Sequence, residues 1–364
     1  MIRLLVVDDS ALVRKLLARV FEAEADFEVE VARDGLEALE RLKTFAPDVV
    51  TLDVHMPTMD GLTCLDRIMI ERPCPVVMVS SLTAEGAEAT LEALRLGAVD
   101  FVAKPAGAVS LRLDEFAPEV VAKVRAAAGA RLPASLRLRD RVRHRIGGPP
   151  PPRRVRAAPP QPVTATRRAS GGGPGLVVVG TSTGGPPALE ALLTPLPAEF
   201  PWPIVIAQHM PRSFTGPLAR RLDSLCALSV QEVVEPTVLR PGTAYIGRGD
   251  ADVIVTRRAG ELVAMAAPGL PGYPWRPSAD RLVRTAMEQV AAERLVGVLM
   301  TGMGDDGAAA MALLRSAGGR TIAEAEETAV VWGMPGELVK AGGAEFVEPL
   351  PRIAGRLHGL APCP

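Results

Sequence analysis

Cysteine is scarce in this sequence, and its few copies are not paired. The 364 residues include four cysteines, with no Cys-x-x-Cys pair and no spacing typical of metal ligands. A chain of this length can bury enough apolar surface to fold without disulfide bonds. The sequence therefore argues against a disulfide-stapled module and a cysteine-based zinc site. Free thiols are expected at Cys64, Cys74, Cys226 and Cys363.

Long apolar runs and an excess of one charge are also missing. No stretch approaches the length of a membrane span, and the apolar run at residues 4–7 ends in two carboxylates without a cleavage site after it. The formal net charge is -1, so the chain as a whole lacks the excess of positive charge that is typical of nucleic-acid-binding proteins. These absences favour a cytoplasmic protein without membrane insertion and without a nucleic-acid partner.

The composition is that of a globular protein with room for two domains. Hydrophobic residues make up 48% and charged residues 23% of the chain. In the first domain, placed at residues 1–128, apolar runs alternate with helical patterns, which predicts a parallel sheet covered on both faces. The predicted strands lie at 4–7, 29–32, 49–54, 76–79 and 101–103, and the predicted helices at 12–20, 36–42, 62–70, 84–96 and 115–128.

Residues 129–173 break this pattern. Between residues 131 and 168 eleven arginines stand against one acid, Asp140, and prolines cluster at 149–152. Such a segment cannot bury enough apolar surface to offset its ordering entropy, so an extended linker is predicted. Its net charge of about +10 suits a solvated tether, which we favour, or docking onto an acidic domain face, a receptor or a nucleic acid.

Strand and helix patterns resume in the second domain, placed at residues 174–364. They predict another doubly wound, mostly parallel sheet. Such sheets bind ligands beyond the carboxyl ends of their strands, so the chemistry is expected in the loops that follow strands. The predicted strands lie at 176–179, 204–207, 244–246, 253–255, 296–300, 321–323 and 344–347, and the predicted helices at 186–193, 214–224, 278–293, 308–317 and 332–340.

Charged side chains collect at the strand ends of the first domain. Asp8 and Asp9 end its first strand, Asp53 ends its third, and Lys104 follows its fifth, while Ser80 ends the fourth. Strand ends on one edge of a parallel sheet converge, and crowded carboxylates need a cation, for which Mg²⁺ with oxygen ligands is suited. Aspartates at strand ends can also be simple helix caps, but caps do not explain a lysine among them.

Six short motifs mark these strand ends and turns: Asp8-Asp9, Leu52-Asp53-Val54, Met56-Pro57, Asp60-Gly61, Ser80 and Lys104-Pro105. With them the domain resembles the flavodoxin-like receiver domains of response regulators. The resemblance implies that Asp53 accepts a phosphoryl group from a histidine kinase, with Mg²⁺ on Asp9 and Asp53 and with Asp8 helping through water. Three residues would respond to the added charge: Ser80, Phe101 and Lys104.

A serine between glycines follows the first apolar run of the second domain. Residues 179–185 read Val-Gly-Thr-Ser-Thr-Gly-Gly and lead from a predicted strand into a predicted helix. Such a turn can hold the oxygen of Ser182 toward a substrate and a backbone amide toward a developing oxyanion. A glycine-rich phosphate loop or a plain tight turn has the same pattern. This segment alone therefore leaves the role of Ser182 open.

Acyl transfer by serine requires a base and a carboxylate that orients the base. Of the two histidines in the second domain, His209 follows the second predicted strand, on the same sheet edge as Ser182, whereas His358 lies near the chain end and is expected at the surface. Residues 300–307, Met-Thr-Gly-Met-Gly-Asp-Asp-Gly, follow another strand and supply carboxylates. Serine, histidine and aspartate can meet at this edge, although Asp305 also suits a helix cap.

Five motifs spread along the second domain lie at residues 180–185, 208–211, 276–280, 301–307 and 333–335. With them the domain resembles the catalytic domain of the chemotaxis protein-glutamate methylesterases over residues 176–357. A receiver joined through a linker to this domain is also the architecture of that family.

The resemblance implies a phosphorylation-regulated serine esterase in chemotaxis or a related chemosensory pathway. Ser182 would attack the side-chain carbonyl of a methylated glutamate on a chemoreceptor, His209 would act as base and then acid, and Asp306 would hold the imidazole. Methanol would leave, and attack on a glutamine would release ammonia, with no cofactor in the esterase site. Thr183 and the backbone amide of Met303 would serve as oxyanion or positioning groups.

Two features depart from the family pattern. Asp305 stands where the family usually has asparagine, which leaves open which carboxylate orients His209, although Gly307 after Asp306 favours Asp306. Residues 247–250, Gly-Arg-Gly-Asp, replace an Ala-Pro-Gly-like loop. The substrate contacts that this loop makes in the family are therefore not assigned to residues 247–250.

Two other functions fit parts of the sequence. A generic α/β-hydrolase also fits Gly-x-Ser-x-Gly but requires the order serine, acid, histidine, and only His358 follows Asp306. A receiver with nucleic-acid-binding output through the basic linker lacks a helix-turn-helix. In the favoured esterase, the unphosphorylated receiver is expected to cover the Ser182 pocket, so that deletion of residues 1–130 raises activity.

Overall fold

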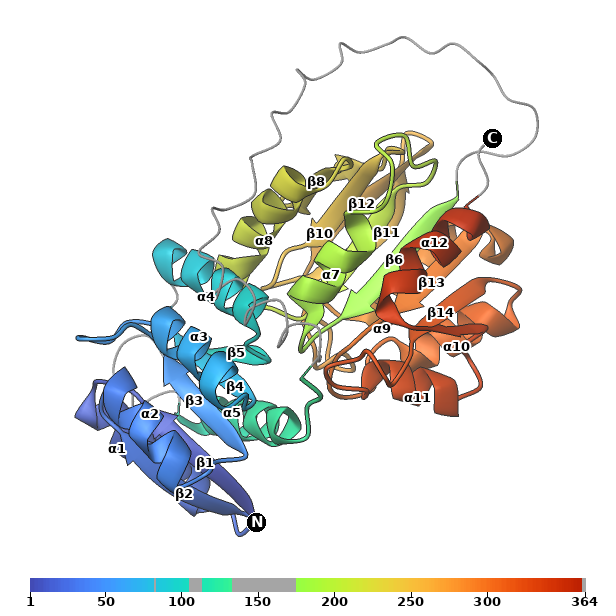
Figure 1. The fold of residues 1–364 in the computed structure, drawn as a ribbon. Coiled ribbons are helices and arrows are strands. Elements are labelled where there is room, and N and C mark those ends of the chain that lie inside the picture. The colour runs from blue at the N-terminus through green and yellow to red at the C-terminus, as the bar shows by residue number, and fades with distance from the viewer. Residues whose placement is uncertain (82, 105–112, 133–174, 362–364) are drawn as a thin grey trace.

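The computed structural model describes residues 1–81, 83–104, 113–132 and 175–361. Within them the chain forms two α/β units that lie side by side (Figure 1). The segment predicted to be a linker lies outside the described residues, apart from residues 129–132. The division at residues 128 and 173 therefore stays a prediction.

The first unit is built around a parallel sheet. Its strands are β1 (Ile2–Val7), β2 (Phe27–Ala32), β3 (Val49–Asp53), β4 (Val76–Ser80) and β5 (Asp100–Ala103). Its helices are α1 (Ala11–Glu22), α2 (Gly35–Thr44), α3 (Gly61–Glu71), α4 (Ala84–Leu96) and α5 (Leu113–Ala128). The strand order is β2-β1-β3-β4-β5, with α1 and α5 against one face and α2, α3 and α4 against the other. The predicted doubly wound fold is confirmed.

Short polar side chains determine where four of these helices begin. Ser10, Asp34, Asp60 and Thr83 each accept a hydrogen bond from a backbone N–H in the first turn of the helix that follows. These bonds satisfy donors that have no partner inside the helix. Each cap stands just after a strand or its loop, so the sheet edge and the helix starts are set together.

The second unit is a larger parallel sheet with helices on both faces. Its strands are β6 (Leu176–Thr181), β7 (Ile204–Gln208), β8 (Ser229–Val233), β10 (Thr243–Gly247), β13 (Leu295–Leu299), β14 (Arg320–Glu324) and β15 (Phe346–Glu348). Its helices are α7 (Gly185–Leu193), α8 (Arg212–Leu225), α9 (Ala279–Gln289), α10 (Ala308–Ser316), α11 (Met334–Lys340) and α12 (Leu350–Leu360). The strand order is β15-β14-β13-β6-β7-β10-β8. The second doubly wound fold is confirmed as well.

The core of this unit lies in two layers, one on each face of the sheet. Val177 and Val179 of β6 pack with α7, α8 and α12, whereas Leu176 and Val178 pack with α9, α10 and α11. Successive side chains of a strand point to opposite faces, so a strand covered on both faces must be apolar throughout. This explains the uninterrupted apolar run that precedes Ser182.

One predicted strand has a different place. Residues 253–255 lie in β11 (Asp252–Arg258), which pairs antiparallel with β12 (Glu261–Ala267) in a separate sheet completed by β9 (Thr237–Val238). A short apolar run does not reveal its partner. The edge strand β8, not predicted, alternates exposed and buried residues and so has no apolar run.

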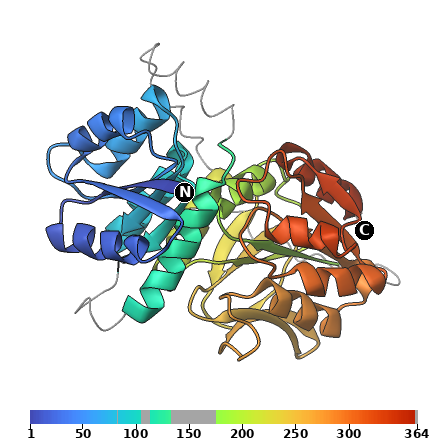
Figure 2. The same cartoon turned by 90° about the horizontal axis from the view of Figure 1, so that it is seen from below.

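The two units meet through α4 and β5 of the first and α7 and α8 of the second. Phe101 of β5 and Phe214 of α8 are both buried, with ring centroids 4.3 Å apart. Helix α5 also lies at this boundary (Figure 2), and beyond its end the N–H of Arg131 donates to the carbonyl of Val330 over 3.2 Å. The first unit is thus packed against the second at the carboxyl end of β6.

Cys64, Cys74 and Cys226 are free thiols, as expected, and Cys363 lies outside the described residues. None of the helices in the described part of the chain is both long enough and apolar enough to cross a membrane.

Candidate active site

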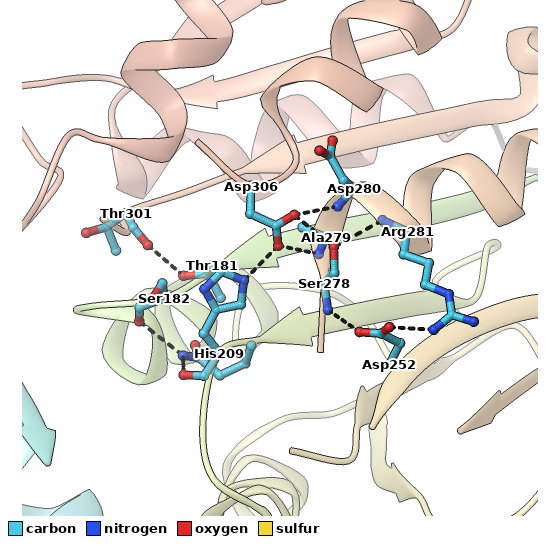
Figure 3. A network of polar contacts seen from close by, with 11 residues as sticks. Thr181, Ser182, His209, Asp252, Ser278, Ala279, Asp280, Arg281, Thr301 and Asp306 are labelled. Atoms are coloured by element: carbon cyan, nitrogen blue, oxygen red, sulfur yellow. Dashed lines mark hydrogen bonds and ion pairs between the residues drawn. The ribbon is translucent and has the colours of Figure 1, made fainter. Parts of the chain in front are cut away.

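Three loops at one sheet edge bring together the residues predicted for catalysis. Ser182 follows β6, His209 follows β7, and Asp306 lies in the loop after β13. These strands are neighbours, in the order β13-β6-β7. In a parallel sheet the loops after neighbouring strands lie beside one another, and the ring of His209 lies between Ser182 and Asp306 (Figure 3).

The imidazole of His209 contacts the carboxylate of Asp306. Its Nε2 lies 2.8 Å from Oδ2 of Asp306, and both side chains are almost completely buried. A carboxylate only accepts hydrogen bonds, so Nε2 carries the proton in a neutral ring and Nδ1 keeps its lone pair. Nδ1 is buried and has no hydrogen-bond partner among the described residues. Nδ1 is therefore the nitrogen available to act as a base.

The first turn of α9 holds Asp306. Its carboxylate accepts hydrogen bonds from the N–H of Ala279 over 2.6 Å and of Asp280 over 3.0 Å, and from Oγ of Ser278 over 2.9 Å. Burial opposes ionisation of Asp306, but the bonds from His209 and from α9 outweigh it, and the pKa of Asp306 is lowered. Asp306 is thus kept as the anion that a triad needs.

A buried ion pair in turn supports this helix start. Asp252 at the start of β11 is fully buried, accepts from the N–H of Ser278 over 2.9 Å, and pairs with Arg281 (Figure 3). The motif at residues 276–280 therefore serves to orient Asp306. Sequence reasoning used this motif only for the resemblance and missed the role of Asp252, which depends on a strand of another sheet.

The backbone of the Ser182 turn is anchored on both sides. The N–H of Ser182 donates to the carbonyl of Thr301 over 3.0 Å, and its carbonyl accepts from Nε2 of Gln208 over 3.0 Å. A Cβ on Gly185 would lie 1.9 Å from Oε1 of Gln208. Only glycine fits there, so the second glycine of the pair is required for this close approach. The Ser182 side chain has no hydrogen bond to any described residue.

The acidic residues of the first unit also converge. Ligand oxygens of Asp8, Asp9 and Asp53 all lie within 4.8 Å of one another. The ammonium of Lys104 lies 2.9 Å from Asp8 and 2.8 Å from Asp53. Burial raises the pKa of Asp53 and the neighbouring Asp8 adds to this, against the opposing effect of Lys104. A hard cation with oxygen ligands fits this set of donors.

The two other predicted switch residues are buried in neighbouring strands, Ser80 at the end of β4 and Phe101 in β5. The hydroxyl of Ser80 is buried and donates to the carbonyl of Gly86 over 3.1 Å, while its carbonyl accepts from the N–H of Lys104 over 2.7 Å. Phe101 points to the second unit and packs on Phe214.

Comparison with known proteins identifies a family for each of the two domains. The family model described as CheB methylesterase matches residues 177–357, and the model for response regulator receiver domains matches residues 4–113. A protein-glutamate methylesterase/protein-glutamine glutaminase of Rhodopseudomonas palustris is 58% identical over 97% of this chain and 96% of its own length. The chain belongs to the CheB methylesterase family.

Other members of this family support the same assignment. A protein-glutamate methylesterase/protein-glutamine glutaminase of Rhodospirillum rubrum is 52% identical over 98% of this chain and 96% of its own length. The crystal structure of the Thermotoga maritima CheB methylesterase catalytic domain is 37% identical, with a TM-score of 0.50, and covers 51% of this chain and 98% of its own. The generic α/β-hydrolase and the nucleic-acid-binding output are thereby set aside.

The receiver domain of this CheB family member touches the turn that carries the candidate nucleophile. The hydroxyl of Thr183, the residue after Ser182, donates to the carboxylate of Asp100 in β5. Thr183 is 1% exposed and Asp100 6%, so this bond is closed off from water. The side chain of Thr183 is thus engaged by the receiver, a contact that the sequence did not reveal.

A buried glutamate lies behind the same turn. Glu324 at the end of β14 is fully buried and accepts from the N–H of Thr301 over 2.8 Å and from the hydroxyl of Thr328 over 3.0 Å. Thr301 is the residue whose carbonyl holds the N–H of Ser182. Burial raises the pKa of Glu324 to about 7. No motif pointed to this residue.

Glu324→Gln is expected to remove a pH-dependent part of the stability. The pKa of Glu324 rises from 4.5 to about 7 on folding. Between these two pH values the folded protein therefore retains a proton that the unfolded chain has lost. This stabilisation is complete below about pH 4.5 and is lost as the pH rises through about 7. Thermal unfolding measured from about pH 5 to about pH 8 should show a steeper fall in Tm for the wild type than for the variant.

The glutamine can keep the contacts of Glu324. Its oxygen can accept from Thr301, and its amide can donate to Thr328, whose hydroxyl can turn to the carbonyl of Ala325, 3.3 Å away. Equal slopes of Tm against pH in the two proteins would contradict the expectation.

Proposed function

We propose that this protein is a phosphorylation-regulated protein-glutamate methylesterase that also deamidates receptor glutamines, with Ser182, His209 and Asp306 as its triad. The observation that carries the proposal is the 2.8 Å contact between His209 and a buried, ionised Asp306, on the loops beside Ser182. The substrates are methylated chemoreceptors, and the result is sensory adaptation in chemotaxis or a related chemosensory pathway.

In the first half of the reaction Ser182 becomes acylated. Oγ of Ser182 attacks the side-chain carbonyl carbon of the methylated glutamate while Nδ1 of His209 takes its proton. Asp306 stabilises the imidazolium through Nε2. When the tetrahedral intermediate collapses, the imidazolium donates its proton to the methoxy oxygen and methanol leaves.

In the second half water restores the enzyme. His209 removes a proton from a water molecule, the resulting hydroxide attacks the acyl carbon, and Ser182 leaves with the proton from the imidazolium. With glutamine as the substrate the same steps release ammonia. No step requires a metal or an organic cofactor.

The oxyanion is assigned to backbone donors beside Ser182. The N–H groups of Thr183 and Met303 donate to no other described residue, which leaves both free for an oxygen that becomes charged during attack. The hydroxyl of Thr183 is bonded to Asp100 of the receiver in this structure, so the oxyanion role is assigned to the backbone N–H of Thr183 and not to its side chain.

The receiver domain is assigned the regulatory role. Asp53 accepts a phosphoryl group from a chemotaxis-type histidine kinase. Asp8, Asp9 and Asp53 would hold Mg²⁺, which when bound would offset the negative charge of the phosphoryl oxygens. Lys104, which lies 2.8 Å from Asp53, pairs with the phosphoryl group. Ser80 and Phe101 change position in response, and the second of these packs directly on the methylesterase domain.

Methanol release from a methylated receptor tests the proposed activity. Ser182→Ala is expected to lower the rate by roughly 10⁴-fold or more, since it removes the nucleophile. A phosphodonor should raise the wild-type rate and leave the rate of Asp53→Asn unchanged. Full activity in Ser182→Ala would overturn the assignment of the nucleophile, and stimulation of Asp53→Asn would overturn that of the phosphorylation site.

A further inference from the structure

An aromatic ring lies flat against the imidazole of His209. Trp275 belongs to the segment that connects β12 to α9, and its indole is stacked on the imidazole with ring centroids 5.3 Å apart and an angle of 5° between the planes. Trp275 is only partly buried, whereas the side chain of His209 is 7% exposed. The indole therefore covers one face of the imidazole.

Hydrogen bonds alone do not fix the plane of this imidazole. Nε2 of His209 is bonded to Asp306, but Nδ1 has no partner among the described residues. A ring held at one nitrogen can still turn about the bond that joins it to Cβ, and this motion moves Nδ1 relative to Ser182. A parallel ring packed on its face opposes that rotation, because turned planes would collide.

The indole is itself held in place by its surroundings. Cζ2 of Trp275 lies 3.3 Å from the position that a Cβ on Gly304 would occupy, so the indole packs over the turn that Gly304 forms with φ +79°. Ser278, three residues further along, bonds to Asp306 through Oγ. One short segment thus contacts both the base and the carboxylate that orients the base.

We propose that Trp275 is a positioning residue for the esterase reaction, which holds the plane of His209 so that Nδ1 stays directed at Ser182 and which shields the imidazolium from water as it forms. The face of an indole also attracts a cation, so the contact favours the protonated ring produced during attack. This inference rests on the proposed triad. It predicts a role in kcat, because the contact acts on the base and not on substrate binding.

Two substitutions separate ring stacking from simple space filling. Trp275→Leu removes the flat face and is expected to lower kcat roughly three- to tenfold, in line with the contribution of an aromatic pair, with little change in KM. Trp275→Phe keeps a flat ring and should recover most of the loss. Tyr273→Leu, an aromatic change in the same segment, is the matched control and should keep the wild-type kcat.

Proton NMR of the full-length protein provides a readout that does not depend on activity. The chain has four histidines, so the ring protons of His209 can be assigned from the signal lost in His209→Asn. In the wild type they should be shifted upfield by the ring current of the indole, and Trp275→Leu should abolish the shift.

Several results would overturn this inference. They are an unchanged kcat in Trp275→Leu, an equal loss in the leucine and phenylalanine variants, a loss in KM alone, an equal effect of Tyr273→Leu, or ring protons of His209 that do not move. If the wild type releases no methanol, the proposed function is refuted, and the proposed role of Trp275 is refuted as well. An active wild type with an unaffected Trp275→Leu refutes only the role of the indole.

Discussion

Replacement of His209 by alanine should slow methanol release by roughly 10⁴-fold or more, because a triad that has lost its base keeps only oxyanion stabilisation and binding. His209 is the histidine whose Nε2 contacts Asp306, and its buried Nδ1 is free to receive a proton. His358 is exposed on the last turn of α12, and its ring centroid lies 6.3 Å from that of Phe200.

His358→Ala is the matched control for this experiment. It removes the same side chain from the same domain and is expected to leave the rate unchanged. Initial rates of methanol release from a methylated receptor, measured for both variants at equal protein concentration, compare the two directly. Loss of activity in His358→Ala with retention in His209→Ala would show that the assignment of the base is wrong.

Asp100→Ala should raise the activity of the unphosphorylated protein. The carboxylate of Asp100 accepts from the hydroxyl of Thr183, next to the candidate nucleophile, in a contact closed off from water. A hydrogen bond to a charged group contributes about 1.5–3 kcal/mol, so its loss shifts the docking of the receiver by roughly tenfold or more. If the docked form is inactive, the basal rate rises with the undocked fraction.

A peripheral contact between the same domains serves as the control. Glu92 of α4 pairs with Arg221 of α8 over 3.4 Å, and the two side chains are 35% and 26% exposed. An ion pair of this kind contributes about 0–1 kcal/mol, so Glu92→Gln should change the basal rate much less than Asp100→Ala. The variant must still be able to accept a phosphoryl group at Asp53. If it does, an unchanged or lower basal rate in Asp100→Ala would indicate that the receiver does not act by covering the Ser182 turn.

The contact of Asp100 is connected to the phosphorylation pocket through a few residues. Asp100 and Phe101 are adjacent in β5, and Lys104 follows the same strand. Lys123 of α5 donates to the carbonyl of Phe101 over 2.8 Å and lies 3.6 Å from Oδ1 of Asp100. A shift of Lys104 toward a phosphoryl group would therefore displace β5, whose Asp100 is bonded to Thr183.

Much of the fold could be predicted because the central strands are buried on both faces. Residues 176–179 and 296–300 are apolar throughout, since helices cover both sides of the sheet, and such runs are visible in a sequence. Strand β8 was missed because it alternates exposed and buried residues at the sheet edge. β11 was assigned to the wrong sheet, because a short apolar run carries no information about its partner.

The residues proposed for chemistry could be found in the sequence for a similar reason. Ser182, His209 and Asp306 each stand directly after an apolar strand or in the loop that follows one, and a parallel sheet brings such loops to one edge. The same logic located Asp8 and Asp53 in the first domain, where the structure places their carboxylates together. By itself, therefore, the sequence determined the fold class of both domains and the sheet edges at which chemistry can occur.

Only the tertiary structure decided how these groups are held. The indole on His209, the α9 turn and Asp252 behind Asp306, the buried Glu324 behind Thr301 and the receiver's Asp100 on Thr183 all join residues far apart in the chain. The presence of a buried strand follows from a local pattern, whereas these contacts depend on residues from different strands and domains that come together only in the folded chain. No local pattern in the sequence encodes such a meeting.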